Sequence, residues 1–503
     1  MGKAMPREVE LKLALSPAAV AAARGHPLLQ GDAPAQRLLS TYYDTPEWTL
    51  RRHGIALRVR RIGAELVQTV KCAGRTGGGL ADRPEWEQPW CGGFDFSRID
   101  DASAAGVLRA CAARLEAVFV TDFTRQTHSF RESGVAIRVM LDVGSVRCGT
   151  SCEPLCELEL ELDSGSHRDL FDLALRLGET LPLWPEARSK AERGYRLCAP
   201  GAEIEERTPA LCVAQSATAA FGELALVEVD AWQEGVRLAE RDTKEGVHQV
   251  RVALRRLRSL LRLFAPLLPE GFSKRWRGRL GDLARELSAA RELDVLCDEL
   301  LAPLVAERGE AAWCAALCRR LERECVAARD AARELLAPPR QGRAMLEFLA
   351  ALYPVTEAAA SAPTPLGDFA VARMARLRRR FRRRLQDLPA AAAEPWHRLR
   401  IAAKQLRYGL EFFAPLWSGK AVANYRRRLA RIQADLGRIQ DLEAAAQRLR
   451  QLAVNAPECR VGETWLARHY AKPASAWRHD ALRQARKLLA ERSPWKRPPQ
   501  AGR

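Results

Sequence analysis

The chain has 503 residues, 47% of them hydrophobic, so it can bury more than one core and two or more domains are expected. The formal net charge is +18, but residues 1–200 carry 26 basic and 26 acidic side chains, so the whole excess of positive charge lies in residues 201–503. This excess predicts that the second part of the chain binds a polyanion, which could be nucleic acid, anionic lipid or polyphosphate. No apolar run is long enough for a signal peptide or a transmembrane helix, which favours a cytoplasmic protein.

The first predicted element is a strand at residues 7–13 with two different faces. Three charged side chains alternate with three aliphatic ones: Glu8, Glu10 and Lys12, with Val9, Leu11 and Leu13 between them. Two carboxylates on one face repel each other unless a cation lies between them, and Mg²⁺ is often held by one or two carboxylates together with substrate phosphates. Alone, the pattern is more typical of a solvated strand face.

The same alternation recurs in the later predicted strands of residues 1–200. Charged or polar side chains share one face in six further segments: Arg58 with Arg60, Thr69 with Lys71, Arg83 with Glu85 and Glu87, Arg125 with Thr127, Arg138 with Asp142, and Glu157 with Glu159 and Glu161. If the sheet closes into a barrel, these faces line its lumen. Buried charges need partners, so such a lumen predicts a compact polyanion with metal ions, and triphosphate fits.

Six segments occur in an order that resembles a known family. They are Glu8-Val9-Glu10-Leu11-Lys12, Tyr43-Asp44-Thr45, Leu57-Arg58-Val59-Arg60, Thr69-Val70-Lys71, Glu157-Leu158-Glu159-Leu160-Glu161 and Ser189-Lys190-Ala191-Glu192-Arg193-Gly194-Tyr195. This set resembles the CYTH family, the triphosphate tunnel metalloenzymes. The resemblance implies that residues 1–200 form an eight-stranded antiparallel β-tunnel with flanking helices, which hydrolyses tripolyphosphate or an organic triphosphate with Mg²⁺ or Mn²⁺.

The resemblance also implies roles for individual residues. Metal would be held by Glu8, Glu10, Glu159 and Glu161, with Glu157 as a further candidate. Phosphate oxygens would be bound by Arg58, Arg60, Lys71, Arg125 and Lys190. Catalytic roles are implied for Lys12, which would orient or deprotonate water or bind phosphate, and for Glu85 and Glu87, one of which would position metal or water. Arg138 departs from the acidic residue expected near its position, and Arg193 and Tyr195 fit a packing role equally well.

After a Pro- and Gly-containing linker at residues 201–214, residues 215–495 are predicted to be an all-α domain. His248-Gln249-Val250-Arg251 recurs as His397-Arg398-Leu399-Arg400, 149 residues later, so the domain contains a repeat with halves at about 215–360 and 361–495. Residues 496–503 are predicted to be a tail. The predicted fold class is therefore α+β multidomain, with an N-terminal β-tunnel and a C-terminal duplicated helical bundle.

Spacings of three and four residues place basic side chains of each repeat on one helix face, opposite an apolar face. The first stripe comprises His248, Arg251, Arg255, Arg258 and Arg262, and the second comprises His397, Arg400, Lys404 and Arg407. A bound anion would relieve the repulsion within each stripe, whereas a solvated face is the alternative. The arrangement resembles the CHAD domain, which implies binding of inorganic polyphosphate. The sequence leaves two roles for His248 and His397: binding of metal or phosphate, or a structural role. Asp294 and Asp441 are expected to pair with the stripe arginines.

Together these patterns predict metal-dependent hydrolysis of inorganic triphosphate, with polyphosphate bound by the helical half and association with polyphosphate granules as a compatible location. The alternatives are hydrolysis of a nucleoside or thiamine triphosphate, cyclase activity on the same scaffold, and a non-catalytic polyphosphate-binding protein. The stripes contain few aromatic residues, which disfavours stacking recognition of single-stranded nucleic acid. The sequence does not specify the preferred triphosphate, the preferred metal or the oligomeric state.

The 13 cysteines are scattered, and none forms a Cys-x-x-Cys pair. Spacings of four link Cys148, Cys152 and Cys156, and also Cys314 and Cys318, which would permit metal binding. Because the number of cysteines is odd and their spacing shows no pairs, free buried thiols in a reducing compartment are favoured instead.

Overall fold

The computed structural model describes residues 7–29, 34–199, 209–357, 364–388, 393–417, 419–454 and 456–495. They form two compact units: unit 1 is Met1–Arg207 with Pro338–Pro354, and unit 2 is Thr208–Ala337 with Val355–Arg503. The predicted tail at 496–503 and most of the predicted linker at 201–214 lie outside the described residues. Within the described ranges, no helix is long and apolar enough to cross a membrane.

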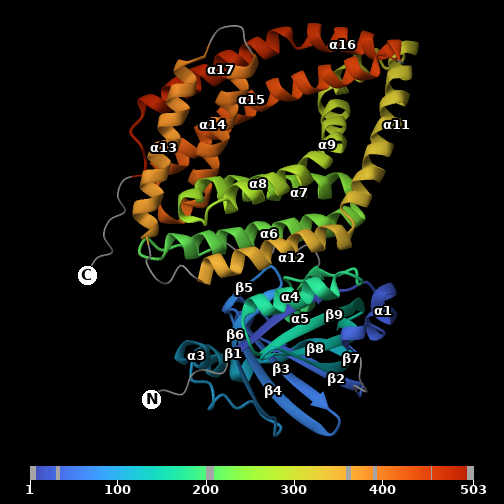
Figure 1. The fold of residues 1–503 in the computed structure, drawn as a ribbon, viewed down its shortest axis with the longest axis vertical. Coiled ribbons are helices and arrows are strands. Elements are labelled where there is room, and N and C mark those ends of the chain that lie inside the picture. Colours follow the sequence, from blue (N-terminus) through green and yellow to red (C-terminus); the bar gives the residue numbers. More distant parts are fainter. Residues whose placement is uncertain are drawn as a thin grey trace. The chain divides into compact units, whose positions relative to one another are not determined.

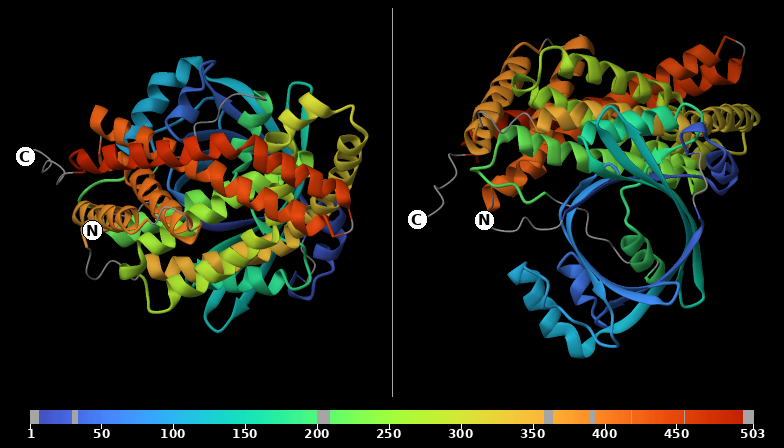
Figure 2. Two further views of the ribbon diagram at one scale, coloured as in Figure 1. Left: turned by 90° about the horizontal axis from the view of Figure 1, so that it is seen from above. Right: turned by 60° about the horizontal axis from the view of Figure 1, so that its bottom comes forward.

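Unit 1 is built on a closed antiparallel barrel, which confirms the predicted tunnel fold (Figures 1 and 2). The ring order is β1, β9, β8, β7, β2, β3, β4 and β6, and pairing of β6 with β1 closes the ring. The bounds are β1 (Arg7–Ala14), β2 (Gln36–Asp44), β3 (Ile55–Ile62), β4 (Glu65–Cys72), β6 (Leu80–Pro89), β7 (Glu116–Glu132), β8 (Val135–Cys148) and β9 (Ser151–Ser164). Two short strands extend the sheet, β5 (Arg75–Gly77) beside β6 and β10 (Trp184–Pro185) beside β1.

Charged and aliphatic residues alternate along the strands because one face of each strand points into the barrel and the other packs outside it. On β1, Leu11 and Leu13 are fully buried. Glu10 and Lys12 on the opposite face are nearly as buried, with exposures of 2% and 3%. The aliphatic face of β1 and β9 lies outside the lumen, where α4 (His167–Leu177) packs against both strands. The charged face points into the barrel, as a period of two requires once the ring is closed.

The other helices of unit 1 are short: α1 (Val20–Arg24), α2 (Thr49–Arg52), α3 (Ala102–Cys111) and α5 (Lys190–Cys198). α5 begins with a capping box in which the Ser189 hydroxyl accepts from the Glu192 amide and the Glu192 carboxylate accepts from the Ser189 amide. The Tyr195 hydroxyl donates to Asp44 Oδ2 at 2.7 Å, and the same carboxylate accepts from backbone amides of α2. Tyr195 and Asp44 therefore fasten α5 to the barrel.

One helix of unit 1 comes from far along the chain. α12 (Pro338–Glu357) lies inside the range that the sequence assigned to the helical half, yet Pro338–Pro354 groups with the barrel. The Tyr353 ring packs on Phe171 of α4 with centroids 5.2 Å apart. The sequence pattern of α12 gave no indication of this position, because an apolar helix face does not reveal which partner covers it.

Unit 2 is helical throughout its described residues, which confirms the predicted all-α fold (Figure 1). Its helices are α6 (Ala217–Arg241), α7 (Thr243–Leu263), α8 (Phe272–Glu286), α9 (Ser288–Val295), α10 (Ala302–Arg308), α11 (Ala312–Leu335), α13 (Leu366–Gln386), α14 (Ala393–Phe412), α15 (Lys420–Leu452), α16 (Pro457–His469) and α17 (Ala471–Ala490). The order α6, α7, a 3-10 turn and α8 recurs as α13, α14, a 3-10 turn and α15. Phe264 and Phe413, equivalent in the repeat, meet in the core with ring centroids 5.8 Å apart.

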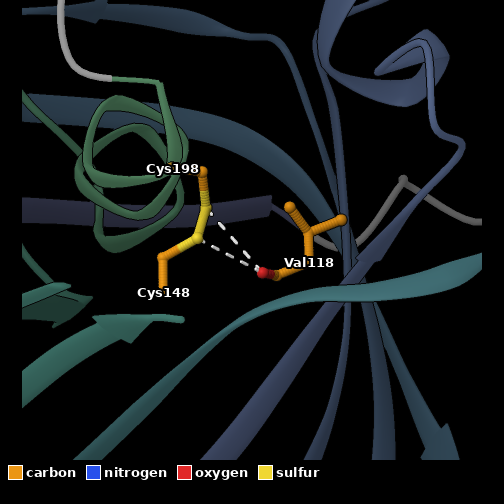
Figure 3. Close-up of a disulfide and its surroundings, with 3 residues drawn as sticks. All are labelled: Val118, Cys148 and Cys198. Atoms are coloured by element: carbon orange, nitrogen blue, oxygen red, sulfur yellow. Dashed lines mark hydrogen bonds between the residues drawn. A yellow bond between two sulfur atoms is a disulfide. The ribbon is translucent and has the colours of Figure 1, made fainter. Parts of the chain in front are cut away.

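The expectation that all cysteines are free thiols is wrong for one pair. Cys148 at the end of β8 and Cys198 at the end of α5 form a disulfide, and their sulfur atoms lie 3.6 and 3.7 Å from the Val118 carbonyl oxygen (Figure 3). The partners are 50 residues apart and only the barrel brings them together, so their spacing carried no signal. Among the described residues, no cysteine belongs to a group of three side chains that could hold a metal ion.

Candidate functional site

A cavity of about 260 Å³ lies inside the barrel. Eight cationic side chains line it: Lys12, Arg58, Arg60, Lys71, Arg83, Arg125, Arg138 and Lys190. Five carboxylates line it as well: Glu8, Glu85, Glu87, Glu159 and Glu161. Three more carboxylates, Glu10, Asp142 and Glu157, are buried in ion pairs with lining cations. The positive and negative groups of the interior therefore balance.

The adjacent strands β1 and β9 form an acidic side of this cavity. Their register places Glu10 opposite Glu161 and Lys12 opposite Glu159. Burial raises the pKa of Glu161 to about 7, and the carboxylates of Glu8 and Glu10 add to this, although Arg138 acts in the opposite direction. Glu10 and Glu159 differ from Glu161, because neighbouring cations outweigh burial and hold the pKa of each below its usual value.

A basic side lies across the ring from β9. β3 is the strand opposite β9 in the ring order, and it contributes Arg58 and Arg60 to the cavity. Burial, followed by repulsion from Arg58 and Arg125, lowers the pKa of Arg60 to about 10. Arg58 differs, because Tyr42 and Glu85 outweigh burial and raise its pKa, so Arg60 is the cation of β3 that its neighbours leave uncompensated.

Lys71 and Arg83 connect the carboxylates of β1 and β6. Lys71 Nζ lies 2.5 Å from Glu8 Oε2 and 3.1 Å from Glu85 Oε2. Arg83 Nη2 donates to Glu10 Oε1 at 2.6 Å, and Lys12 Nζ lies 3.3 Å from the same oxygen. Burial opposes ionisation of Glu10, but Lys12 and Arg83 outweigh it and hold the pKa of Glu10 below its usual value. Glu10 is consequently ionised at neutral pH.

Lys190, in the first turn of α5, lies at the centre of a buried carboxylate cluster. Its Nζ is 2.8 Å from Asp142 Oδ2 and 2.8 Å from Glu159 Oε1, and it also donates to Glu157. Burial acts to lower the pKa of Lys190, but the three carboxylates outweigh it and hold that pKa above its usual value. Oxygens of the three carboxylates lie within 4.8 Å of one another and could hold a metal ion, but the ammonium group already supplies the cation there.

The structure brings together all twelve tunnel residues that the sequence singled out. Eleven line the cavity, and the twelfth, Glu10, is buried behind Lys12 and Arg83. Glu87 is the most open of the carboxylates, with 52% of its side chain exposed, and its Oε1 accepts from Thr69 Oγ1 at 2.9 Å.

Sequence reasoning gave no site role to Arg83, Tyr42 or Asp142. Arg83 and Tyr42 line the cavity, and Asp142 binds both Arg125 and Lys190. The alternation of the strands already placed two of these residues on the lumen face, because Arg83 shares a strand face with Glu85, and Asp142 shares one with Arg138.

The metal ligands predicted from the sequence are Glu8, Glu10, Glu159 and Glu161, but among the described residues the acidic group with oxygens within 4.8 Å of one another is Asp142, Glu157 and Glu159. The donor set of Glu8, Glu10, Glu159 and Glu161 offers only oxygen, which is the ligand atom that Mg²⁺ and Mn²⁺ prefer. Burial is the largest cause of the raised pKa of Glu161, and Glu8 and Glu10 add to it, so a cation beside Glu161 would favour its ionised form.

In unit 2, both predicted basic stripes are half-buried. On α7, Arg251 donates to Ser288 Oγ at 2.7 Å, and Arg255 Nε donates to the Tyr408 hydroxyl on α14 at 2.7 Å. Arg258 Nε and Arg400 Nε are buried without a hydrogen-bond partner among the described residues. Guanidinium groups in this state are poorly satisfied by the protein itself.

The charges that shift their pKa values divide the stripe residues into two groups. In the first group, burial followed by repulsion from Arg400 and Arg255 lowers the pKa of Lys404 to about 7. In the second group, burial followed by repulsion from Arg277, Arg380 and Arg258 lowers the pKa of Arg262 to about 10. Each group contains more cations than nearby acids can balance.

The histidines that begin the stripes have different surroundings. His397 is exposed and its Nδ1 lies 2.8 Å from Gln440 Oε1 of α15. Burial, followed by repulsion from Arg291, lowers the pKa of His248, which keeps it neutral at pH 7.

The expected pairing of Asp294 with a stripe arginine is wrong, because Asp294 accepts from Arg329 of α11 at 2.6 Å. Asp441 does lie near the stripes: burial raises its pKa, and Arg400 and Lys404 act against that rise.

Comparison with known proteins gives two family matches. Residues 6–195 match the CYTH domain and residues 220–450 match the CHAD domain. An inorganic triphosphatase of Haemophilus influenzae is 32% identical over 206 residues, which are 39% of this chain and 56% of that protein. The chain thus spans little more than half the length of this curated relative.

Two solved structures resemble separate parts of the chain. The CHAD domain from the plant Ricinus communis is 28% identical with a TM-score of 0.50, and the match covers 58% of this chain and 98% of that one. An adenylyl cyclase from Hippeastrum, described as having a dominant triphosphatase activity, is 17% identical with a TM-score of 0.28, and the match covers 37% of this chain and 95% of that one.

Proposed function

The chain carries a CYTH domain at residues 6–195 followed by a CHAD domain at residues 220–450, and on this premise we propose that it hydrolyses inorganic triphosphate in its tunnel with Mg²⁺ or Mn²⁺. One observation carries the proposal. The closed barrel lines one cavity with the carboxylates of Glu8, Glu159 and Glu161 and with the guanidinium groups of Arg58 and Arg60, so a ligand in the cavity meets side chains of both signs. A complex of a divalent cation with a triphosphate supplies both charges at once.

The cavity favours an inorganic substrate over a nucleotide. Its volume of about 260 Å³ is below the range of about 300–1,000 Å³ that is usual for pockets of organic ligands. Tyr42 is the one aromatic side chain among the lining residues, and its ring is 4% exposed and stacked on Phe119 with centroids 4.5 Å apart. No aromatic face of the described lining residues is therefore free to stack on a base.

The side chains divide the work of hydrolysis between binding and orientation. Arg58, Arg60 and Lys71 neutralise the non-bridging phosphate oxygens, on which charge develops during transfer of the phosphoryl group. Glu85 lies 3.7 Å from Arg58 and 3.1 Å from Lys71, so it holds both cations in place. A bound Mg²⁺ or Mn²⁺ supplies further charge neutralisation when it is held by Glu8, Glu10, Glu159 and Glu161.

Lys12 is the side chain best placed to orient the attacking water. It lines the cavity and is 3% exposed, and its Nζ donates to the ionised Glu10 at 3.3 Å. The ammonium group of Lys12 carries donors only, so it is proposed to donate to water or to a phosphate oxygen. Arg125 and Lys190 remain proposed phosphate contacts, although in this structure both bind carboxylates.

The proposal is tested by phosphate release from tripolyphosphate, ATP, thiamine triphosphate and long-chain polyphosphate, each with Mg²⁺ and with Mn²⁺. We expect kcat/KM for tripolyphosphate to exceed that for each organic triphosphate, because the cavity offers an organic group no stacking surface. The activity is expected to disappear with excess chelator and to return with added metal. Preference for an organic triphosphate, or turnover that survives metal removal, would contradict the assignment.

We further propose that unit 2 binds inorganic polyphosphate through its two groups of stripe cations. The first group comprises Arg251, Arg255, Arg400, Lys404 and Arg407 with His248 and His397 at its margin, and the second comprises Arg258 and Arg262 with Arg277 and Arg380. Support comes from the half-buried position of the stripes and from the lowered pKa values of Arg251, Arg258, Arg262, Arg380, Arg400 and Lys404, because a bound polyanion would relieve the repulsion that contributes to the lowering. The half-buried position also shields these contacts from screening by salt.

Polyphosphate binding by unit 2 is expected to weaken as the pH rises from about 7 to about 9. The free protein loses the Lys404 proton near pH 7, whereas a bound polyanion favours the charged form, so binding above pH 7 must take up a proton. Titration calorimetry with long-chain polyphosphate at several pH values measures this effect. Lys404→Arg serves as the matched control and should bind with little dependence on pH across the same range. Equal pH dependence in both proteins would exclude Lys404 from the binding surface.

A further inference from the structure

We propose that α12 positions Lys12 in the tunnel, so that a helix within the CHAD part of the sequence sets the turnover number of the CYTH domain. The positioning residues are Leu349 and Tyr353, which are not among the residues that line the cavity. The inference rests on the triphosphatase function proposed above, and it adds a part of the catalytic unit that lies outside residues 6–195.

α12 holds the turn between β5 and β6. The buried hydroxyl of Tyr353 donates to the Gly77 carbonyl oxygen at 3.2 Å. Leu349 is fully buried and lies directly on Gly78, where a Cβ atom would come within 2.5 Å of Leu349 Cδ2. Gly78 also has φ +61°, so this turn requires glycine both for its backbone conformation and for the close approach of α12.

α12 also lies on the segment that leads into β10. A Cβ atom on Gly342 would come within 2.2 Å of the Leu183 carbonyl oxygen and 2.7 Å of Trp184 Cβ, so the two backbones are in direct contact. β10 pairs with β1 next to the catalytic segment, with Leu13 opposite Pro185 and Ala14 opposite Trp184. The helix therefore supports both segments that flank this part of β1.

These two segments supply the hydrogen bonds of the Lys12 backbone. The Lys12 amide donates to the Gly79 carbonyl oxygen at 2.9 Å, and the Lys12 carbonyl oxygen accepts from the Glu186 amide at 2.8 Å. Gly79 lies so close that a Cβ atom there would be 2.8 Å from the Lys12 carbonyl oxygen. Both peptide groups of Lys12 are thus fixed by segments that α12 covers.

Loss of the α12 contacts should therefore move Lys12 without removing any group that binds substrate. A displacement of about 1 Å in a catalytic group can lower the rate by about 100-fold, so partial loosening should have a measurable effect. In the full-length double variant Leu349→Ala/Tyr353→Phe, we expect kcat for tripolyphosphate to fall about tenfold, with KM changed by less than about twofold.

Matched variants separate positioning from a general loss of stability. Leu349→Met keeps the volume over Gly78 and should restore most of kcat. Arg343→Ala lies on the exposed side of the same helix, where Arg343 pairs only with Glu347 in the described contacts, and it should leave kcat unchanged. Assays are run well below the unfolding temperature measured for each protein. A double variant that is folded and retains wild-type kcat would overturn the proposal.

Hydrogen exchange tests the same contact without using activity. In the double variant, a peptide covering residues 9–15 should exchange faster than in the wild type, because the bond from the Lys12 amide to Gly79 is loosened, while a peptide covering residues 120–130 of β7 should not change. If the wild type hydrolyses no triphosphate but this exchange difference appears, the proposed function fails and the positioning by α12 stands. Equal exchange at residues 9–15 in both proteins would contradict the positioning itself.

Discussion

The variant Glu10→Gln is expected to lower metal-dependent hydrolysis of tripolyphosphate by about 100-fold or more while the barrel stays folded. Glu10 is 2% exposed, and Lys12 and Arg83 hold its pKa below the usual value, so it contributes a full negative charge at neutral pH. Glutamine keeps the shape and one acceptor oxygen but removes the charge. The variant therefore loses a ligand of the proposed metal site and the partner that orients Lys12 Nζ, which lies 3.3 Å away.

Phosphate release over a range of Mg²⁺ and Mn²⁺ concentrations measures this loss. The required metal concentration should rise and kcat should fall, because the substitution affects both metal and Lys12. Glu65→Gln, an exposed position at the start of β4, is the matched control and should behave as the wild type. Thermal unfolding establishes that the Glu10 variant is folded. Undiminished turnover by a folded Glu10→Gln protein would remove the proposed metal site from β1.

The variant Lys190→Met should destabilise unit 1 by about 3–5 kcal/mol, the usual cost of removing one partner from a buried ion pair. Lys190 is the shared cation of Asp142, Glu157 and Glu159, and these carboxylates would then repel one another in a dry interior. Glu157 shows the beginning of this effect, because burial already raises its pKa to about 6 with Lys190 present.

A divalent cation should stabilise this variant by more than it stabilises the wild type. With the ammonium group removed, the three carboxylates form an oxygen site with atoms within 4.8 Å of one another, so Mg²⁺ can take the place of Nζ. Thermal unfolding with and without Mg²⁺ measures this difference. Arg196 lies on the same helix and has no ion pair among the described contacts. Arg196→Met should therefore neither lower the stability of unit 1 by this amount nor make that stability depend on Mg²⁺. A Lys190→Met protein as stable as the wild type would show that the cluster is not held together by Lys190.

The barrel could be predicted from sequence because its strands carry their own signal. Glu8, Glu10 and Lys12 alternate with aliphatic residues, and the same period of two on β9 places Glu159 and Glu161 on one face. Once closure is assumed, every charged strand face must point into the lumen, whereas Lys190, which lies on α5, was assigned to the site through the resemblance to the CYTH family. This is why the cavity contains the predicted residues even though no single strand distinguishes a lumen from a solvated surface.

The partners of those residues could not be predicted in the same way. Lys190 and Arg125 were expected at phosphate oxygens, and the structure places both on buried carboxylates. The choice between carboxylate and phosphate depends on distances across the barrel, which the period of a strand does not contain. The same limit applies to the Cys148–Cys198 disulfide and to α12, whose contacts join segments that no local pattern relates.

The contact between Tyr353 and Gly77 has a consequence for how the protein is made. The two residues are 276 positions apart, so ribosomal synthesis delivers every strand of the barrel long before α12 emerges. If the barrel strands fold during synthesis, the β5–β6 turn and the β10 segment are not covered by α12 until that helix has been made. The tunnel reaches its final form only after α6 to α11 have been translated, so the proposed hydrolysis is expected to begin only when the first of the two basic stripes has also been made.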